Sequence, residues 1–341
     1  MNPKGKRIDH RLSAVPFEEL TEELLKRLYA RRLEITHLLQ SLDGQNHPLS
    51  RPAFQHWAKR FTLAGEVSHA LEERQFVIHY QPQVHLTTRK LVGFEALVRW
   101  RHPTRGLVRP DEFVAVAEET GLIIPLGDWV LDQACRQLSF WRQEVPGAEA
   151  LTMHVNVASA QIGRENTPIL VDECLDRYKL PPEALHLEIT ETSVIDNPEV
   201  VARTLEKLRH RNVQVWLDDF GTGHSSLSSL HRFALSGLKI DRSFVGQMEQ
   251  PNSGMIIKAI LALSHSLGLR VTAEGIETAR QADELEKWQC EFGQGYYFSK
   301  PVSARAATKY LFTQSLGVLA HKRNAHSEAL ATSGLPRLMV V

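Results

Sequence analysis

The chain has only three cysteines in 341 residues, and no two of them have the spacing of a redox pair or a metal-binding pair. A disulfide framework or a thiolate zinc site is therefore not expected. Cys135, Cys174 and Cys290 are interpreted as small buried apolar residues in a reducing compartment.

The chain also lacks an excess of either charge and a long apolar run. Forty lysines and arginines balance forty acids, which gives no support for bulk nucleic-acid binding, although it does not exclude a local basic groove. No apolar stretch approaches about 18 residues, so no membrane span is expected. No apolar segment follows the basic start, so no signal peptide is expected and we predict a cytoplasmic protein.

The hydrophobic content of 43% is enough for a large core. The pattern of apolar and polar residues along the chain predicts three parts. Residues 1–63 are predicted to form a helical extension, with amphipathic patterns over Pro16–Leu42 and Ala53–Glu73. We interpret it as helices packed on the main domain or on a second subunit, with a signal-transmitting helix pair as the alternative. Residues 64–313 form the main domain, and residues 314–341 are predicted to be a mobile tail.

Short apolar runs alternate with helical patterns in the main domain. Helix starts are predicted at Pro110-Asp111, Gly127-Asp128, Asn197-Pro198 and Asn252-Ser253. Only Val84–Lys90 separates the first two strands, which is too short for a crossover helix, so these strands should be antiparallel. We predict an α/β fold, an irregular (β/α)₈ barrel of the TIM type. The predicted strands are Phe76–Gln81, Leu91–Val98, Leu151–Val157, Leu185–Thr190, Val213–Leu217, Gly237–Ile240, Leu269–Ala273 and Cys290–Gln294.

Polar residues occur at the ends of these apolar runs, where a barrel enzyme displays its chemistry. Several carboxylates packed together would repel each other without a cation among them. Oxygen ligands without His or Cys favour Mg²⁺ or Mn²⁺ over Zn²⁺. The residues at the run ends are Glu95, Asn156, Glu188, Asp218, Asp219, Lys239, Glu274 and Gln294.

Two adjacent aspartates allow one carboxylate to bridge two ions while the next binds only one. Paired ions about 3.5–4 Å apart serve in-line attack at phosphorus. The glycines that follow in Asp218–Gly223 permit a tight loop that could move as a lid. The competing interpretations are solvated loop acids and a nucleotide phosphate loop, but a phosphate loop would not have two acids in front of its glycines.

The same residues make the chain resemble the EAL family, bacterial phosphodiesterases that cut cyclic di-GMP. The resemblance extends over about residues 64–313 and depends on many blocks in the same order. The signature block is Glu95-Ala96-Leu97, continued through Arg99. The others begin at Tyr80, Val155, Glu188, Asp218, Leu238, Ala273 and Gly293.

This resemblance implies a role for each residue. Glu95, Asn156, Glu188 and Asp218 would hold one Mg²⁺ or Mn²⁺, and Asp218 would bridge to a second held by Asp219. Lys239 would orient and help activate the attacking water, and Glu274 would assist as base. Gln294 would help hold the water or the second metal, and Gln81, Arg99 and Asp241 would contact the substrate. Glu191 would support the aspartate loop, and Glu277 would be a further supporting acid. The expected product is linear pGpG, Ca²⁺ should inhibit, and a homodimer is expected.

Two positions depart from the family pattern and two other functions remain open. His224 stands where the family usually has Tyr, and Ala158 stands where it usually has Ser. A cyclic di-GMP receptor with slow turnover is one alternative, although every expected ligand is present. A barrel phosphodiesterase for another substrate, such as a glycerophosphodiester, would need catalytic histidines, and His79 and His85 lack a convincing arrangement.

Overall fold

The structure is a computed structural model that describes residues 51–191, 193, 198–221 and 233–313. The chain divides into two compact units, Met1–Glu73 and Arg74–Val341. The described part of the first unit is helix α2, Arg51–Glu72, which matches the helix predicted from Ala53 and crosses the predicted boundary at residue 63. The predictions for Pro16–Leu42, for His224 and for the tail 314–341 concern residues outside the described ranges.

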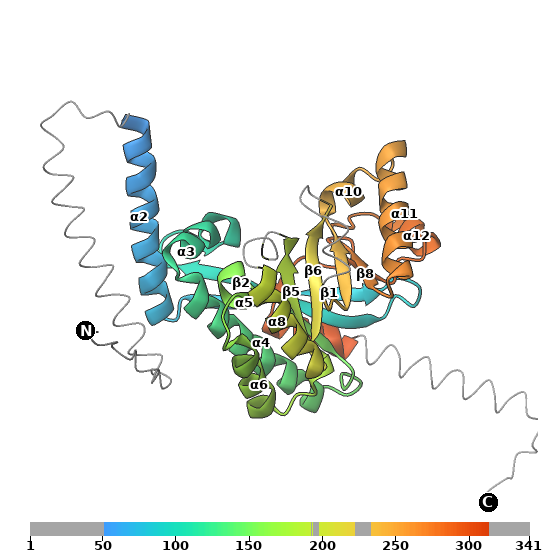
Figure 1. Ribbon diagram of the computed structural model, residues 1–341, viewed down its shortest axis with the longest axis horizontal. Helices are drawn as coiled ribbons and strands as arrows, with labels where there is room; N and C mark the ends of the chain where they lie inside the picture. The colour runs from blue at the N-terminus through green and yellow to red at the C-terminus, as the bar shows by residue number, and fades with distance from the viewer. Residues whose placement is uncertain (1–50, 192, 194–197, 222–232, 314–341) are drawn as a thin grey trace, which may run out of the picture. The chain divides into compact units, whose positions relative to one another are not determined.

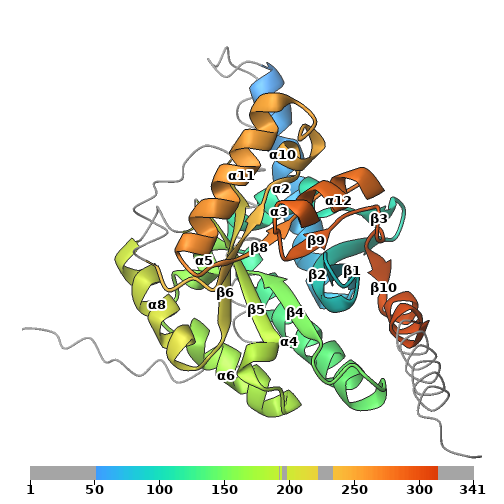
Figure 2. The same ribbon diagram turned by 90° about the vertical axis from the view of Figure 1, so that its right-hand side faces the viewer.

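The second unit is a closed barrel (Figure 1, Figure 2). Its sheet has the order β10-β1-β9-β8-β7-β6-β5-β4-β2-β3, and β1 also pairs with β2, which closes the ring. The eight barrel strands are β1 Phe76–His85, β2 Leu91–His102, β4 Thr152–Asn156, β5 Leu185–Thr190, β6 Gln214–Phe220, β7 Gly237–Ile240, β8 Arg270–Ala273 and β9 Phe292–Gln294. The predicted barrel is confirmed, with all eight strands.

Strand β1 runs antiparallel to β2, as the short Val84–Lys90 connection predicted, and it is also antiparallel to β9 on its other side in the ring. The β1–β2 hairpin is longer than predicted, because its pairing extends from Val84 and Leu91 to Phe76 and Trp100. Two short antiparallel strands were not predicted: β3, Gly106–Val108, and β10, Val302–Ser303.

Helices surround the strands on the outside of the barrel (Figure 2). They are η1 Pro110–Glu112, α3 Val114–Thr120, α4 Ile123–Glu144, α5 Ser159–Ile162, α6 Thr167–Tyr178, η2 Pro182–Ala184, α8 Pro198–His210, α10 Arg242–Gly246, α11 Pro251–Ser266 and α12 Ala279–Lys287. The helix start predicted at Gly127-Asp128 was wrong, because α4 already begins at Ile123 and Pro125 fits its first turn. No helix in the described ranges has the length and apolar content that crossing a bilayer requires.

The apolar core lies between the outer face of the strands and these helices. Trp141 on α4 is fully buried and packs against Tyr80 and Phe94, with ring centroids 4.8 and 4.9 Å apart. Because successive side chains of a strand point to opposite faces, the residues between these apolar positions point into the barrel. The inward face is polar over much of its length, and it carries the candidate site.

Candidate active site

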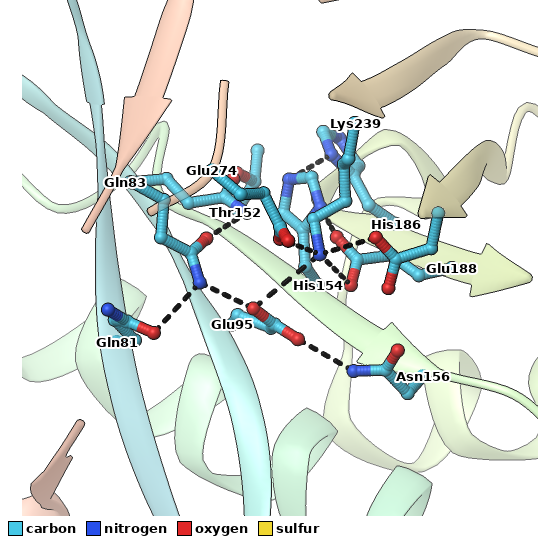
Figure 3. A network of polar contacts seen from close by, with 12 residues as sticks. Gln81, Gln83, Glu95, Thr152, His154, Asn156, His186, Glu188, Lys239 and Glu274 are labelled. Carbon is cyan, nitrogen blue, oxygen red and sulfur yellow. Dashed lines mark hydrogen bonds and ion pairs between the residues drawn. The ribbon is translucent and has the colours of Figure 1, made fainter. Parts of the chain in front are cut away.

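Lys239 lies at the centre of the predicted acids. Its ammonium Nζ is 2.6 Å from Glu274 Oε1, 2.9 Å from Glu188 Oε2, 3.1 Å from Asp218 Oδ1 and 3.6 Å from Glu95 Oε2 (Figure 3). Strands β2, β5, β6 and β7 and the residue after β8 supply these five side chains. The predicted convergence of strand-end acids on one point is therefore present in the structure.

One ammonium does not balance four carboxylates in a buried site. Burial and the neighbouring carboxylates raise the pKa of Glu274 to about 8 and that of Glu188 well above its usual range. Burial alone would lower the pKa of Lys239, but the surrounding acids raise it well above the ordinary value, so Lys239 stays charged. The four carboxylates therefore carry more negative charge than the ammonium in contact with them can balance, and such an environment suits added divalent ions.

The donor set fits a hard cation. Carboxylate oxygens of Asp218, Asp219 and Glu274 lie within 4.8 Å of one another, close enough to share one ion. Burial and the adjacent Asp218 also raise the pKa of Asp219 to about 6. The geometry groups Glu274 with the two aspartates, a grouping that the sequence pattern did not suggest.

The backbone at Asp218-Asp219 explains how two adjacent residues serve one site. In a regular strand their side chains would point to opposite faces. The register between β6 and β7 shifts between Leu217 and Phe220, and Asp219 has a left-handed φ of 55°. Such an irregularity redirects a side chain next to a site.

Amide side chains hold Glu95 in place. Asn156 Nδ2 donates to Glu95 Oε1 at 2.7 Å, and Gln294 Nε2 donates to Glu95 Oε2 at 2.5 Å. Gln294 Nε2 also contacts Gln81 Oε1 at 3.0 Å, and Gln83 Nε2 donates to Gln294 Oε1 at 2.9 Å. Burial raises the pKa of Glu95, but Lys239 and these amides outweigh it and leave that pKa below the ordinary value. Glu95 is therefore held ionised.

Glu95 does not end its strand, contrary to the prediction. It lies within β2, which continues to His102 in the hairpin with β1. Pairing of β2 with β4 stops at Ala96, however, so Glu95 still lies next to the end of the parallel β2–β4 pairing, at the mouth of the barrel.

Sequence reasoning missed a pair of histidines beneath Glu188. His154 Nδ1 is 2.7 Å from Glu188 Oε1, and His154 Nε2 is 2.8 Å from His186 Nδ1. Burial lowers the pKa of His186 to about 3 and that of His154 well below its ordinary value, so both rings are neutral. Each histidine lies two residues before a predicted ligand, Asn156 or Glu188, and this spacing on one strand face could have revealed them.

The structure places the remaining predicted residues as follows. Arg99 is half-buried, with Glu95 and Tyr296 as charged or polar neighbours. The Glu191 carboxylate accepts from Gly221 N at 3.2 Å, where the aspartate loop begins. Asp241 caps helix α10 by accepting from the Ser243 backbone N–H at 3.0 Å, and Glu277 is exposed.

Comparison with known proteins identifies relatives for most of the chain. The EAL domain family profile matches residues 64–301. The signaling protein YkoW of Bacillus subtilis is 39% identical over 72% of this chain, and the cyclic di-GMP phosphodiesterase NbdA of Pseudomonas aeruginosa is 39% identical over 79% of it. The matched segments make up 30% and 34% of those proteins, so the chain spans about a third of the length of these curated relatives.

Solved structures show the same fold. The structure titled "PaMucR Phosphodiesterase, c-di-GMP complex" is 38% identical, with a TM-score of 0.69 over 72% of this chain and 99% of that one. The EAL enzyme Bd1971, in a cAMP- and cyclic-di-GMP-bound form, is 30% identical, with a TM-score of 0.74 over 85% of this chain and 79% of that one. With its barrel, its converging acids and these matches, the chain belongs to the EAL domain family.

Proposed function

We propose that the chain hydrolyses one phosphodiester bond of cyclic di-GMP and releases linear pGpG. The observation that supports this most is the group of four carboxylates within 3.6 Å of one lysine ammonium at the mouth of the barrel. Relatives named as cyclic di-GMP phosphodiesterases supply the substrate class.

The proposed metals are two Mg²⁺ or Mn²⁺ ions. Glu95, Asn156, Glu188 and Asp218 would hold one, and Asp218 with Asp219 would hold the other, within reach of Glu274. When bound, such ions lower the pKa of water and neutralise charge that develops on the phosphoryl oxygens. This donor set contains only oxygen, which favours these ions over zinc.

The side chains of the chain position the reactants. Lys239 is charged, so it acts as a hydrogen-bond donor and fixed positive charge beside the attacking water. Glu274 contacts Lys239 at 2.6 Å and lies beside Asp218 and Asp219, so it is the carboxylate best placed to accept the proton of that water once bound cations hold it ionised. Arg99 and Gln81 would bind the substrate phosphate and orient the bond for in-line attack, in which the proton ends on the leaving 3′ oxygen.

The test is incubation of the purified full chain with cyclic di-GMP and Mg²⁺, followed by chromatography of the nucleotides. Accumulation of pGpG supports hydrolysis, whereas tight binding without product supports the receptor alternative. Glu188→Gln should stop product formation, and the surface variant Glu284→Gln should not. Equal rates for the two variants would show that the reaction occurs elsewhere.

We also propose that the chain forms a homodimer, which is common in the EAL family. Helix α11 exposes Met255 and Ile256, which are 61% and 43% accessible. Light scattering during gel filtration tests this, because Met255→Glu should shift a dimer toward the monomer. A wild-type chain that elutes as a monomer would disprove the proposal.

A further inference from the structure

A pocket of about 600 Å³ lies at the opposite end of the barrel from the acids. It is lined by residues at the beginnings of strands, including Leu91 of β2, Thr152 of β4 and Arg270 of β8. In barrel enzymes the mouth near the carboxyl ends of the strands carries the chemistry, and this opposite end normally serves stability. A pocket of this size at that end therefore needs a separate explanation.

Trp216 lines this pocket and has an unused hydrogen-bond donor. Its side chain is 1% accessible, and in the described part of the chain its indole Nε1–H has no acceptor. The six-membered ring faces β7, because a Cβ on Gly237 would come within 2.7 Å of Trp216 Cζ3. The Nε1 nitrogen is itself buried, so the Trp216 ring, rather than its N–H, forms part of the pocket wall.

The polar groups around the pocket favour an anion. Arg270 lies over the Trp216 ring at 5.3 Å, and its guanidinium donates to Gln214 Oε1 at 3.0 Å. Lys90 adds a second positive charge at the rim. His154 and His186 face the pocket as neutral rings, and none of the described residues that line it is acidic. The charge of Glu291 acts on Arg270 from outside the lining. A carboxylate, sulfonate or phosphate group in the pocket would therefore meet the positive charges of Arg270 and Lys90 without an acid among the lining residues.

The rest of the lining is apolar and favours an aromatic or branched body. Leu91, Leu151, Phe292 and Leu311 contribute apolar surface, together with the ring of Trp216. An apolar lining with a few converging polar groups is the usual composition of a small-molecule site, and 600 Å³ is within the usual range of volumes.

We propose that this pocket is a binding site for small organic anions with an aromatic body, separate from the phosphodiesterase centre. Arg270 would pair with the anionic group, and the Trp216 ring would contact the aromatic body. His154 is common to both places, because it lines the pocket while its Nδ1 contacts Glu188. The inference does not depend on the proposed hydrolysis.

Two probes that differ in charge test this directly. 8-Anilino-1-naphthalenesulfonate carries an aromatic body and a sulfonate, and N-phenyl-1-naphthylamine carries the same body without charge. Titration of the full chain, followed by fluorescence and calorimetry, should show one saturable site per chain that binds the sulfonate about tenfold more tightly than the neutral probe.

Variants then locate the site. Ala150, an exposed residue of the lining, tolerates a larger side chain without disturbing the core. Ala150→Trp should abolish binding of both probes, and Ala150→Ser should keep it. Arg270→Gln should remove the preference for the sulfonate, and the exposed Arg203→Gln should not. If Arg270→Gln fails to fold, Lys90→Gln at the rim should still weaken the sulfonate preference.

The outcomes are decisive in each direction. Loss of both probes in Ala150→Trp, with the charge preference lost in Arg270→Gln or reduced in Lys90→Gln, supports the site. Unchanged binding by Ala150→Trp, equal affinity of the wild type for the two probes, or the absence of a saturable site would overturn it. None of these readouts uses cyclic di-GMP, so a failure here leaves the proposed hydrolysis intact.

Discussion

Replacing Lys239 by methionine removes the ammonium that contacts four carboxylates of the site. The side chain keeps nearly its length but loses contacts of 2.6, 2.9, 3.1 and 3.6 Å to Glu274, Glu188, Asp218 and Glu95. Removing one partner of a buried ion pair costs about 3–5 kcal/mol, because the other charge is left buried without compensation. For a domain of this size that corresponds to a melting temperature about 6–20 °C lower.

Divalent ions should reverse part of this loss. They would supply positive charge to the same carboxylates, and binding to the folded state alone raises its stability. Calorimetry of Lys239→Met in EDTA and in Mg²⁺ measures both effects. In Mg²⁺ the turnover of the variant should stay about 100-fold or more below that of the wild type, because the lysine donor is missing from the water site. Binding of cyclic di-GMP should persist.

Lys287→Met is the matched control, because Lys287 makes a similarly short contact of 2.8 Å to Glu284 but on the surface. It should leave both stability and turnover close to those of the wild type. The reasoning is refuted if Lys239→Met melts like the wild type in EDTA, or if it retains normal turnover. Loss of substrate binding alone would show that Lys239 contacts the substrate rather than the water.

Three further predictions concern the same centre. Glu95→Ala should lower turnover about 100-fold or more, since it removes a carboxylate held by Asn156 and Gln294; near-normal rates of pGpG formation would contradict its assignment. Ca²⁺ in place of Mg²⁺ should leave substrate bound but suppress hydrolysis, because Ca²⁺ is larger and accepts looser coordination; undiminished hydrolysis with Ca²⁺ would contradict the proposed geometry. In EDTA, thermal stability should fall as the pH rises from about 4 to 8. The pKa values of Asp219 and Glu274 are raised in the folded chain to about 6 and about 8. The folded chain therefore keeps protons that the unfolded chain has already released, and this difference destabilises it as the pH rises. Asp219→Asn should flatten the part of this fall below about pH 6, and an equal slope in the variant and the wild type would argue against the raised pKa.

Much of the barrel could be predicted because the sequence pattern is local. Each strand is a short apolar run with a polar residue near its end, and the Val84–Lys90 connection fixes the direction of β1. The start of α4 was misplaced because Ile123–Leu126 is apolar throughout and carries no capping residue, so Gly127-Asp128 looked like the stronger signal. Strands β3 and β10 were missed because they are very short and depend on antiparallel pairing with distant segments.

The parts of the site that escaped prediction depend on the tertiary structure. His154 and His186 come together only because β4 and β5 pair in a register that sets them opposite each other. The redirection of Asp219 depends on a register shift and a left-handed φ, which residue types alone do not encode. The grouping of Glu274 with the aspartates follows from closure of the ring, since β8 and β6 are not neighbours in the sheet.

The most direct test of the metal centre is X-ray diffraction from crystals of the full chain grown with Mn²⁺, with data collected at the manganese absorption edge. The account predicts two anomalous peaks about 3.5–4 Å apart, both in contact with Asp218, one of them reaching Glu95 and Glu188 and the other Asp219. A map in which these carboxylates hold no manganese, or hold it away from Asp218, would contradict the account.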